Sequence, residues 1–202
     1  MQKDLIVFKL DDSKATNEYI KSIKKRDITI DVTENVFVDL KDIKNKYLAS
    51  LVVKPDSHNK LLQGQYRMLV DILGDFNIEP QGIQYPIINT IVKIVEQLPS
   101  NKNVVIIGRS EELGIPLANE LIRRDYIVTV VNSKNNNALT NAEVVINTAP
   151  IDKLLYTDIA TVIDVAGTIK ETNADVLINK IGKKMTMELE RTIHKLKSEK
   201  DL

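Results

Sequence analysis

Short apolar runs alternate with stretches of helical periodicity in the second half of the chain. The runs are rich in valine and isoleucine, which is typical of strands buried on both faces of a parallel sheet. They predict strands at 103–107, 127–131, 143–147 and 161–165, a helix at 112–124, and short helical turns between the later strands. A parallel sheet of this kind has its ligand crevice at the carboxyl ends of the strands.

The first half of the chain alternates in the same way. Three apolar runs predict strands, at 4–9, 28–33 and 50–53. Polar and apolar positions at helical spacing predict three helices, at 14–26, 40–47 and 61–73. Side chains that can cap the first helix precede it, at Asp11, Asp12 and Ser13. The first half is therefore also expected to be α/β.

A loop rich in glycine and proline separates the two halves, with Gly74, Pro80 and Gly82. Pro86 then begins a helix that we expect to reach Leu98. These signals predict an N-terminal domain over 1–84 and a second domain over 85–184. A last helix at 185–200 has one apolar face and one face of Lys, Arg and Glu, so we expect it to pack back on the N-terminal domain with a solvated outer face.

The composition narrows the function classes. The chain has 202 residues, with 28 Lys+Arg against 28 Asp+Glu, and this zero net charge argues against a nucleic-acid-binding surface. Cysteine is absent and the two histidines are far apart in sequence, so we expect no metal site. No apolar run has the roughly 18 residues of a membrane span, and the apolar stretch near the start is short, so we expect no signal peptide. We expect a cytoplasmic protein.

The most informative segment joins the strand at 103–107 to the helix after it. Gly108 follows the strand directly, and Gly114 lies at the start of the helix. A buried strand that runs into a glycine turn and a helix start leaves backbone N–H groups free beside the positive end of the helix, which suits a pyrophosphate. The generic G-x-G-x-x-G fingerprint is absent, so this signal is weak without the surrounding residues.

The surrounding residues make the signal specific. Gly108-Arg109-Ser110-x-x-Leu113-Gly114-x-Pro116 resembles the G-R-S-x-x-V-G-x-P motif of the bifunctional methylenetetrahydrofolate dehydrogenase/methenyltetrahydrofolate cyclohydrolase family. Val162-Ile163-Asp164-Val165 is similar to its V-I-D-V segment, and Asp11-Asp12 followed by Thr16 and Tyr19 is similar to its G-D-D-P-A-S-x-x-Y segment. The chain thus looks like a shortened, divergent member. The resemblance implies a Rossmann-like, parallel-sheet dinucleotide-binding domain plus a smaller α/β N-terminal domain, joined by the C-terminal helix.

The resemblance also implies a cofactor, a substrate and a homodimer. The substrate is a small-molecule folate. The cofactor-binding positions that it implies are Gly108, Arg109, Ser110, Gly114, Ile115, Ser133, Lys134, Thr148 and Ala149. An NAD-specific site would place an acidic residue after the strand at 127–131, but Asn132, Ser133 and Lys134 follow it, so we expect NADP, with NAD as the alternative.

The departures from the family pattern fall on catalytic positions. Tyr19 matches the tyrosine of the family's Y-x-x-x-K motif, but the lysine position is Ile23. Lys24 is the neighbouring candidate for proton transfer, although it lies about 100° further round a helix. Val53 replaces a glutamine, and a folate-side aspartate aligns with Leu73 or Asp75. The segment Asn147-Thr148-Ala149-Pro150 replaces A-V-G-x-P.

Three interpretations therefore remain open from the sequence. The first is a dehydrogenase/cyclohydrolase that acts on 5,10-methylene- or 5,10-methenyltetrahydrofolate. The second is a catalytically degenerate homologue that binds a dinucleotide or a partner protein without folate chemistry. The third is a dehydrogenase with a different small substrate. Substitution of Ile23 by lysine is expected to raise cyclohydrolase activity if the missing lysine alone is decisive.

Overall fold

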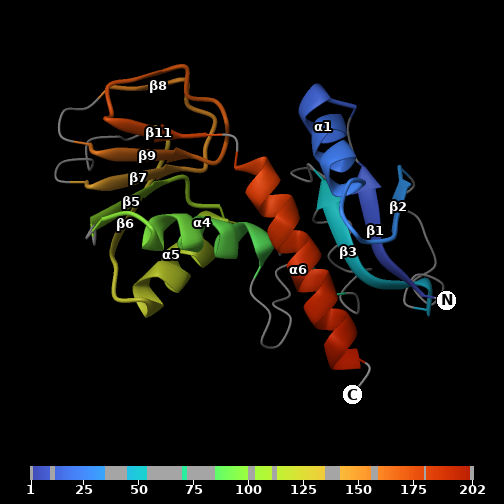
Figure 1. Cartoon of the computed structure of the whole chain (residues 1–202). Helices are drawn as coiled ribbons and strands as arrows, with labels where there is room; N and C mark the ends of the chain where they lie inside the picture. The colour runs from blue at the N-terminus through green and yellow to red at the C-terminus, as the bar shows by residue number, and fades with distance from the viewer. Residues whose placement is uncertain are drawn as a thin grey trace. The chain divides into compact units, whose positions relative to one another are not determined.

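The computed structural model describes ten segments of the chain, at 2–9, 12–34, 45–53, 70–71, 85–99, 103–110, 113–134, 142–155, 159–179 and 181–200. The chain divides into two compact units. The first unit comprises Met1–Ile87 together with Gly182–Leu202, and the second comprises Ile88–Ile181. Figure 1 shows each unit as strands accompanied by helices.

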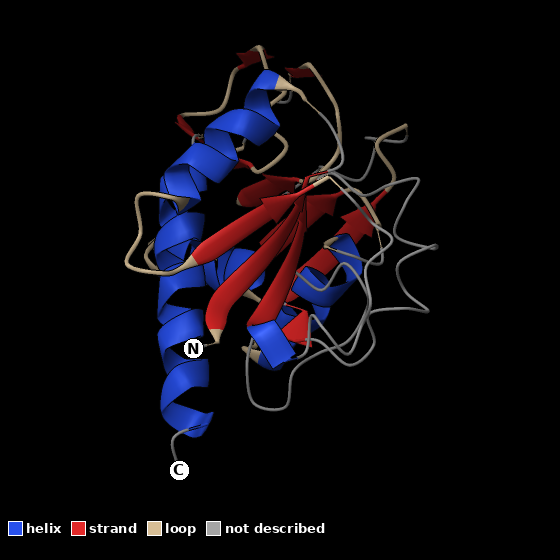
Figure 2. Cartoon of the chain, turned by 90° about the vertical axis from the view of Figure 1, so that its right-hand side faces the viewer, coloured by secondary structure: helices blue, strands red, loops and turns tan. Residues whose placement is uncertain are grey.

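The sheet of the first unit is parallel, with the strand order β2-β1-β3-β4. Its strands are β1 (Lys3–Lys9), β2 (Ile30–Thr33), β3 (Tyr47–Val53) and β4 (Val70–Asp71). Helix α1 (Lys14–Ile23) follows β1, and Ser13 caps it by accepting a hydrogen bond from the Thr16 N–H. Helix α6 (Gly182–Lys200) contacts both α1 and β3, so the C-terminal segment completes this unit (Figure 2).

One apolar cluster holds the first unit together. Fully buried Leu5 and Leu51 face the cluster from β1 and β3, and α6 contributes Leu189 and Ile193. Polar contacts reinforce this packing: Lys197 of α6 forms an ion pair with buried Asp4 at 2.9 Å. The apolar positions of the last helix thus pack where its amphipathic pattern predicts.

The sheet of the second unit is five-stranded and parallel, with the order β11-β9-β7-β5-β6. Its strands are β5 (Asn103–Ile107), β6 (Ile127–Val131), β7 (Val144–Asn147), β9 (Thr161–Asp164) and β11 (Val176–Ile178). Helix α5 (Gly114–Arg123) connects β5 to β6, and α4 (Pro86–Glu96) precedes β5. The strand order reverses beside β5, because the chain goes from β5 outward to β6 and then to β7 on the other side. Such a switch point is where open α/β sheets bind ligands.

The predicted strands of the second unit are confirmed, including β5 and β6 at the predicted bounds, and with them the α/β class. Helix α5 is shorter than predicted at both ends. The short helical turns expected between the later strands are wrong for the described residues. There the chain forms β8 (Lys153–Leu154), which pairs with β10 (Glu171–Thr172). Strand β11 is not predicted either, and it forms one edge strand of the five-stranded sheet.

Two helix predictions in the first half also need correction. The helix expected at 40–47 is confirmed at residues 45 and 46, which are helical, but it ends before Tyr47, which begins β3 opposite Lys3 of β1. The helix expected at 61–73 cannot include Val70 and Asp71, which form β4 beside β3. In both places the chain makes ladder hydrogen bonds to β1 or β3, which local periodicity does not reveal. Helix α1 ends at Ile23 rather than Arg26. Residues 40–44, 61–69, 72 and 73 lie outside the described residues, and so does the glycine–proline loop.

Candidate dinucleotide site

Gly108 directly follows β5 in the second sheet, and its backbone has a conformation that few other residue types adopt. Its φ is +109°, and its N–H donates to the Val131 carbonyl at 2.9 Å, so the turn begins while the chain is still bonded to β6. A Cβ at this position would lie 2.4 Å from Thr148 Oγ1. Both the backbone conformation and the space therefore require glycine here.

Gly114 is required by close approach rather than by φ. It is the first residue of α5, and a Cβ there would lie 2.1 Å from the carbonyl oxygen of Gly108. The helix therefore begins in direct contact with the backbone of the glycine turn. Glycines that allow a helix to approach a strand end closely are part of how parallel sheets build phosphate-binding turns.

Ser110 accepts hydrogen bonds from the backbone N–H groups that the sequence predicts to be free. Its Oγ accepts hydrogen bonds from the N–H groups of Leu113 and Gly114, at 3.2 and 3.4 Å, and its carbonyl accepts from the Ile115 N–H at 3.0 Å. The expectation of free N–H groups is thus wrong for these three residues, because the Ser110 hydroxyl binds two of the N–H groups and the Ser110 carbonyl binds the third. Arg109, by contrast, is exposed and has no ion-pair partner among the described residues.

A second polar group follows β6, which pairs with β5. Asn132 Oδ1 accepts hydrogen bonds from the Lys134 N–H at 3.1 Å and from Ser133 Oγ at 3.4 Å, so residues 132–134 form a turn stabilised by the asparagine side chain. The Lys134 side chain is exposed. Because β5 and β6 are parallel neighbours, Arg109 and Lys134 both follow the carboxyl edge of the sheet. Two exposed cations at that edge suit phosphate groups.

Thr148 and Ala149 approach the same turn from the end of β7. Thr148 donates both its N–H and its hydroxyl to the Ile107 carbonyl, each at 2.9 Å. The structure thus brings the predicted positions 108, 148 and 149 together. The sequence interpretation gave no role to Asn147 and Asp164, the last residues of β7 and β9, which are buried and hydrogen-bonded to each other. Both are polar residues at the end of an otherwise apolar strand, and Asp164 also belongs to the segment that resembles the family's V-I-D-V.

The predicted catalytic positions of the first unit do not form a polar site among the described residues. Ile23 is fully buried in the apolar cluster of that unit, and Val53 belongs to the same cluster. Tyr19 is half-buried and packs against this cluster. Lys24 is exposed and forms the C-cap of α1, so it follows the last helical turn rather than standing beside Tyr19. Leu73 and Asp75 lie outside the described residues.

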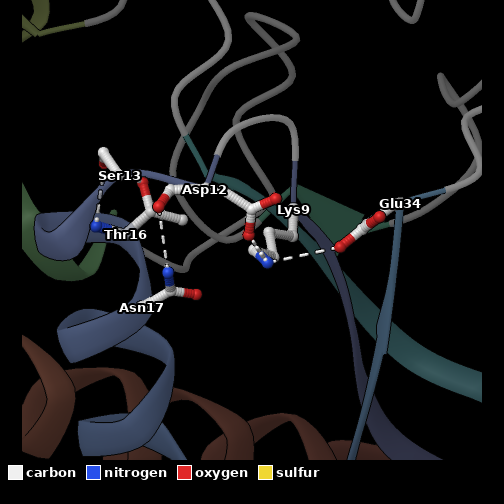
Figure 3. A network of polar contacts seen from close by, with 6 residues as sticks. All are labelled: Lys9, Asp12, Ser13, Thr16, Asn17 and Glu34. Carbon is white, nitrogen blue, oxygen red and sulfur yellow. Dashed lines mark hydrogen bonds and ion pairs between the residues drawn. The ribbon is translucent and has the colours of Figure 1, made fainter.

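One polar network of this unit lies at Lys9, the last residue of β1 (Figure 3). Lys9 forms ion pairs with Asp12, which lies just before α1, and with Glu34, which follows β2, the latter at 3.2 Å. The hydrogen bond from Lys9 to Asp12 raises the pKa of Lys9 above its ordinary value. The Asp12 carbonyl also accepts from Asn17 Nδ2 at 3.1 Å. This network fixes the start of α1, and sequence reasoning did not single out Lys9.

No group of metal-binding side chains and no helix suited to cross a bilayer occurs in the part of the chain that the structure describes.

Comparison with known proteins agrees with the geometry of the second unit. The sequence model of the family "Tetrahydrofolate dehydrogenase/cyclohydrolase, NAD(P)-binding domain" matches residues 85–188. A relative from Thermosipho africanus named bifunctional protein FolD is 44% identical over 66 residues, which cover 29% of this chain and 24% of that relative. The matched part is therefore well under two thirds of the length of that relative.

Solved structures share the fold over nearly the whole chain. The FolD enzyme of Campylobacter jejuni superposes with a TM-score of 0.73 at 20% identity, covering 98% of this chain and 89% of that one. The Trypanosoma brucei FolD, solved with NADP cofactor and an inhibitor, gives a TM-score of 0.75 at 15% identity, covering 98% and 87%. At such identities the likeness shows the fold alone.

Proposed function

Since its residues 85–188 match the family model, the chain belongs to the tetrahydrofolate dehydrogenase/cyclohydrolase family, and on that premise we propose that it binds NADP and oxidises 5,10-methylenetetrahydrofolate. The single observation that carries the proposal is the turn after β5. There Gly108 has a positive φ, and α5 begins against its carbonyl, at the switch point of a parallel sheet.

The residues at this edge fit a phosphorylated dinucleotide. Glycine at positions 108 and 114 lets Thr148 and the start of α5 pack directly against the turn, which fixes the shape of the backbone after β5. Arg109 supplies an exposed guanidinium and Lys134 an exposed ammonium, which are the groups that bind phosphate oxygens. We assign to the same site Ser110, Gly114, Ile115, Ser133, Thr148 and Ala149.

The chemistry at the end of β6 favours NADP over NAD. No Asp or Glu stands among residues 132–134, where a carboxylate would accept hydrogen bonds from the adenosine ribose. The turn instead presents the Ser133 hydroxyl and the Lys134 ammonium. A 2′-phosphate is the ribose substituent that these donors complement.

The proposed reaction is hydride transfer. When bound, the oxidised nicotinamide supplies the hydride acceptor, and the methylene group of the folate supplies the hydride. Such a step depends chiefly on holding the two reacting carbons close together and aligned. The second unit needs no titrating side chain for this role, and its contribution is to bind and orient.

Ile23 favours a second candidate function for the same fold. A buried isoleucine cannot exchange a proton, and acid–base groups typically supply about 10² to 10⁴ in rate. The position that resembles the family's lysine thus has no cyclohydrolase role in this chain. The alternative is a homologue that binds the dinucleotide without folate chemistry.

Calorimetry and a turnover assay with the full chain test these candidates together. We expect NADP to bind at least about tenfold more tightly than NAD, because the 2′-phosphate adds charge-assisted hydrogen bonds. We also expect NADPH to appear when 5,10-methylenetetrahydrofolate is added. Arg109→Met should weaken NADP binding, whereas Arg123→Met is the matched control, since Arg123 is an exposed arginine at the far end of α5.

Each result separates the candidates. Binding of NADP with turnover supports the dehydrogenase, and binding without turnover supports the second candidate. Tighter binding of NAD would contradict the assignment of Ser133 and Lys134. Absence of binding by either coenzyme would refute the proposal.

A further inference from the structure

A buried polar pair stands at the carboxyl ends of β7 and β9. Asn147 and Asp164 are paired directly in the register of these strands, and their exposed fractions are 0% and 2%. Asn147 Nδ2 donates to Asp164 Oδ1 at 2.8 Å. Buried polar groups hold one arrangement firmly when all their hydrogen-bonding capacity is used, because each alternative leaves a donor or acceptor unsatisfied.

Asp164 organises the loop that follows its own strand. Its Oδ1 also accepts from the Gly167 N–H at 3.0 Å, and its Oδ2 accepts from the Ile169 N–H at 2.9 Å. The chain can curl round the carboxylate in this way because Gly167 has a φ of +69°. Three N–H donors thus converge on one buried carboxyl group.

Asn147 ties that loop to the one after β7. Its carbonyl accepts from the N–H groups of Val165 and Ala166, at 2.9 and 3.2 Å, and its side-chain Oδ1 accepts from the Ala149 N–H at 3.1 Å. Thr168 adds a further link by donating its hydroxyl to the Ile151 carbonyl at 2.7 Å. The loops at 148–151 and 165–169 are therefore bonded to each other and to the Asn147–Asp164 pair.

This arrangement acts directly on the glycine turn. The Ala149 N–H is held by Asn147, and the preceding residue, Thr148, lies so close to Gly108 that no side chain fits between them. We propose that Asn147 and Asp164 are positioning residues that hold Thr148 and Ala149 against the Gly108 turn, in the orientation that NADP binding requires. This inference rests on the proposed function of the turn. A binding site needs such support, because small displacements of the contacting groups lose affinity.

The test measures NADP binding by calorimetry in three variants, at a temperature where each is shown to be folded. Asn147→Ala removes the bonds to Asp164 and to the Ala149 N–H, and we expect the Kd for NADP to rise about tenfold. Asp164→Asn keeps the shape and one acceptor oxygen, so its Kd should lie between those of the native chain and Asn147→Ala. Glu143→Ala is the matched control, because the Glu143 carboxylate accepts a hydrogen bond from the Asn103 N–H at the amino end of β5, away from the turn.

A purely structural pair would lower the melting temperature but leave the Kd of the folded protein unchanged. That result in Asn147→Ala, or an equal rise of Kd in Glu143→Ala, overturns the positioning role. If Asn147→Ala does not fold, Thr168→Val cuts one link between the loops with little change of shape. A several-fold higher Kd in that variant supports the inference, and an unchanged one overturns it. A native chain that binds neither coenzyme refutes the proposed function as well, so the two failures are distinct.

Discussion

Substitution of Gly114 by alanine tests whether the glycine turn has the geometry described here. The added Cβ would lie 2.1 Å from the Gly108 carbonyl oxygen and 2.9 Å from the Gly108 carbonyl carbon, whereas ordinary contact begins at 3.4 Å. Both neighbours are backbone atoms at the end of β5, so no side-chain rotation can relieve the overlap. Helix α5 must move away from the turn, or the turn must move from the sheet.

The expected cost follows from two opposing effects. Alanine is favoured over glycine within a helix by up to about 1 kcal/mol, and less at the first helical residue. Overpacking of a closely packed contact costs about 1–3 kcal/mol. The second effect is larger, so we expect a net loss of stability of about 1–2 kcal/mol. For a domain of the length of the second unit, Ile88–Ile181, this loss lowers the melting temperature by roughly 4–16 °C. Binding of NADP should weaken as well.

Thermal unfolding and calorimetry measure these effects, with Gly182→Ala as the matched control. Gly182 is the first residue of α6, as Gly114 is of α5, but a Cβ there would have no neighbour within 4 Å. The control should keep or slightly raise the melting temperature and leave NADP binding intact. A Gly114→Ala variant as stable as Gly182→Ala, with native affinity for NADP, would show that α5 does not approach Gly108 as described.

Two further predictions concern the first unit. Ile23→Lys should destabilise the chain by roughly 4–5 kcal/mol at pH 7, because an amine in that apolar cluster must stay neutral, and urea unfolding should show that this loss of stability diminishes as the pH rises. The control Ile23→Met should cost less than about 1.5 kcal/mol. A lysine variant as stable as the methionine variant would contradict the burial of this position. Burial acts to raise the pKa of Asp4, but hydrogen bonds from Thr29 and Lys197 outweigh it and lower the pKa below the usual 3.8. The stabilisation by Asp4 is therefore present above pH 3.8 and is lost progressively as the pH falls through the lower folded-state value. Asp4→Asn should lower the urea midpoint more at pH 7 than at pH 3, and an equal difference at both pH values would refute this linkage.

The sequence could predict the second unit well because its central strands β5, β7 and β9 are buried almost throughout and the neighbouring β6 is also a run of β-branched residues. Four apolar runs, each followed by turn residues, can be placed without knowledge of their partners, and β5 and β6 have the predicted bounds. Gly108 and Gly114 could be identified for a related reason. A glycine directly after a buried strand, and another at a helix start, indicate backbone geometry that local sequence determines.

The remaining features depend on partners distant in sequence. Strand β4 has two residues and exists only because β3 offers it a ladder, and β8 depends on β10 in the same way. The hydrogen bond from the Leu113 N–H to Ser110 could have been inferred from their spacing, since serine hydroxyls commonly bind backbone N–H groups a few residues further on. The bond between Asn147 and Asp164 could not, because it requires β7 and β9 to be neighbours in register.

The burial of Ile23 changes what a lysine at that position would test. From the sequence alone, Ile23→Lys reads as restoration of a catalytic group, but the side chain lies among Leu5, Leu51 and Leu189 rather than in a polar site. A loss of stability would then mask any gain in chemistry. Dehydrogenation needs positioning by the second unit, whose turn and polar pair are intact, whereas cyclohydrolysis needs a proton-transferring group that position 23 does not supply. The two activities should therefore separate in this chain, with NADPH formation measurable while hydrolysis of 5,10-methenyltetrahydrofolate stays at the uncatalysed rate, and a protein that catalyses both would place the proton transfer on a residue other than Ile23.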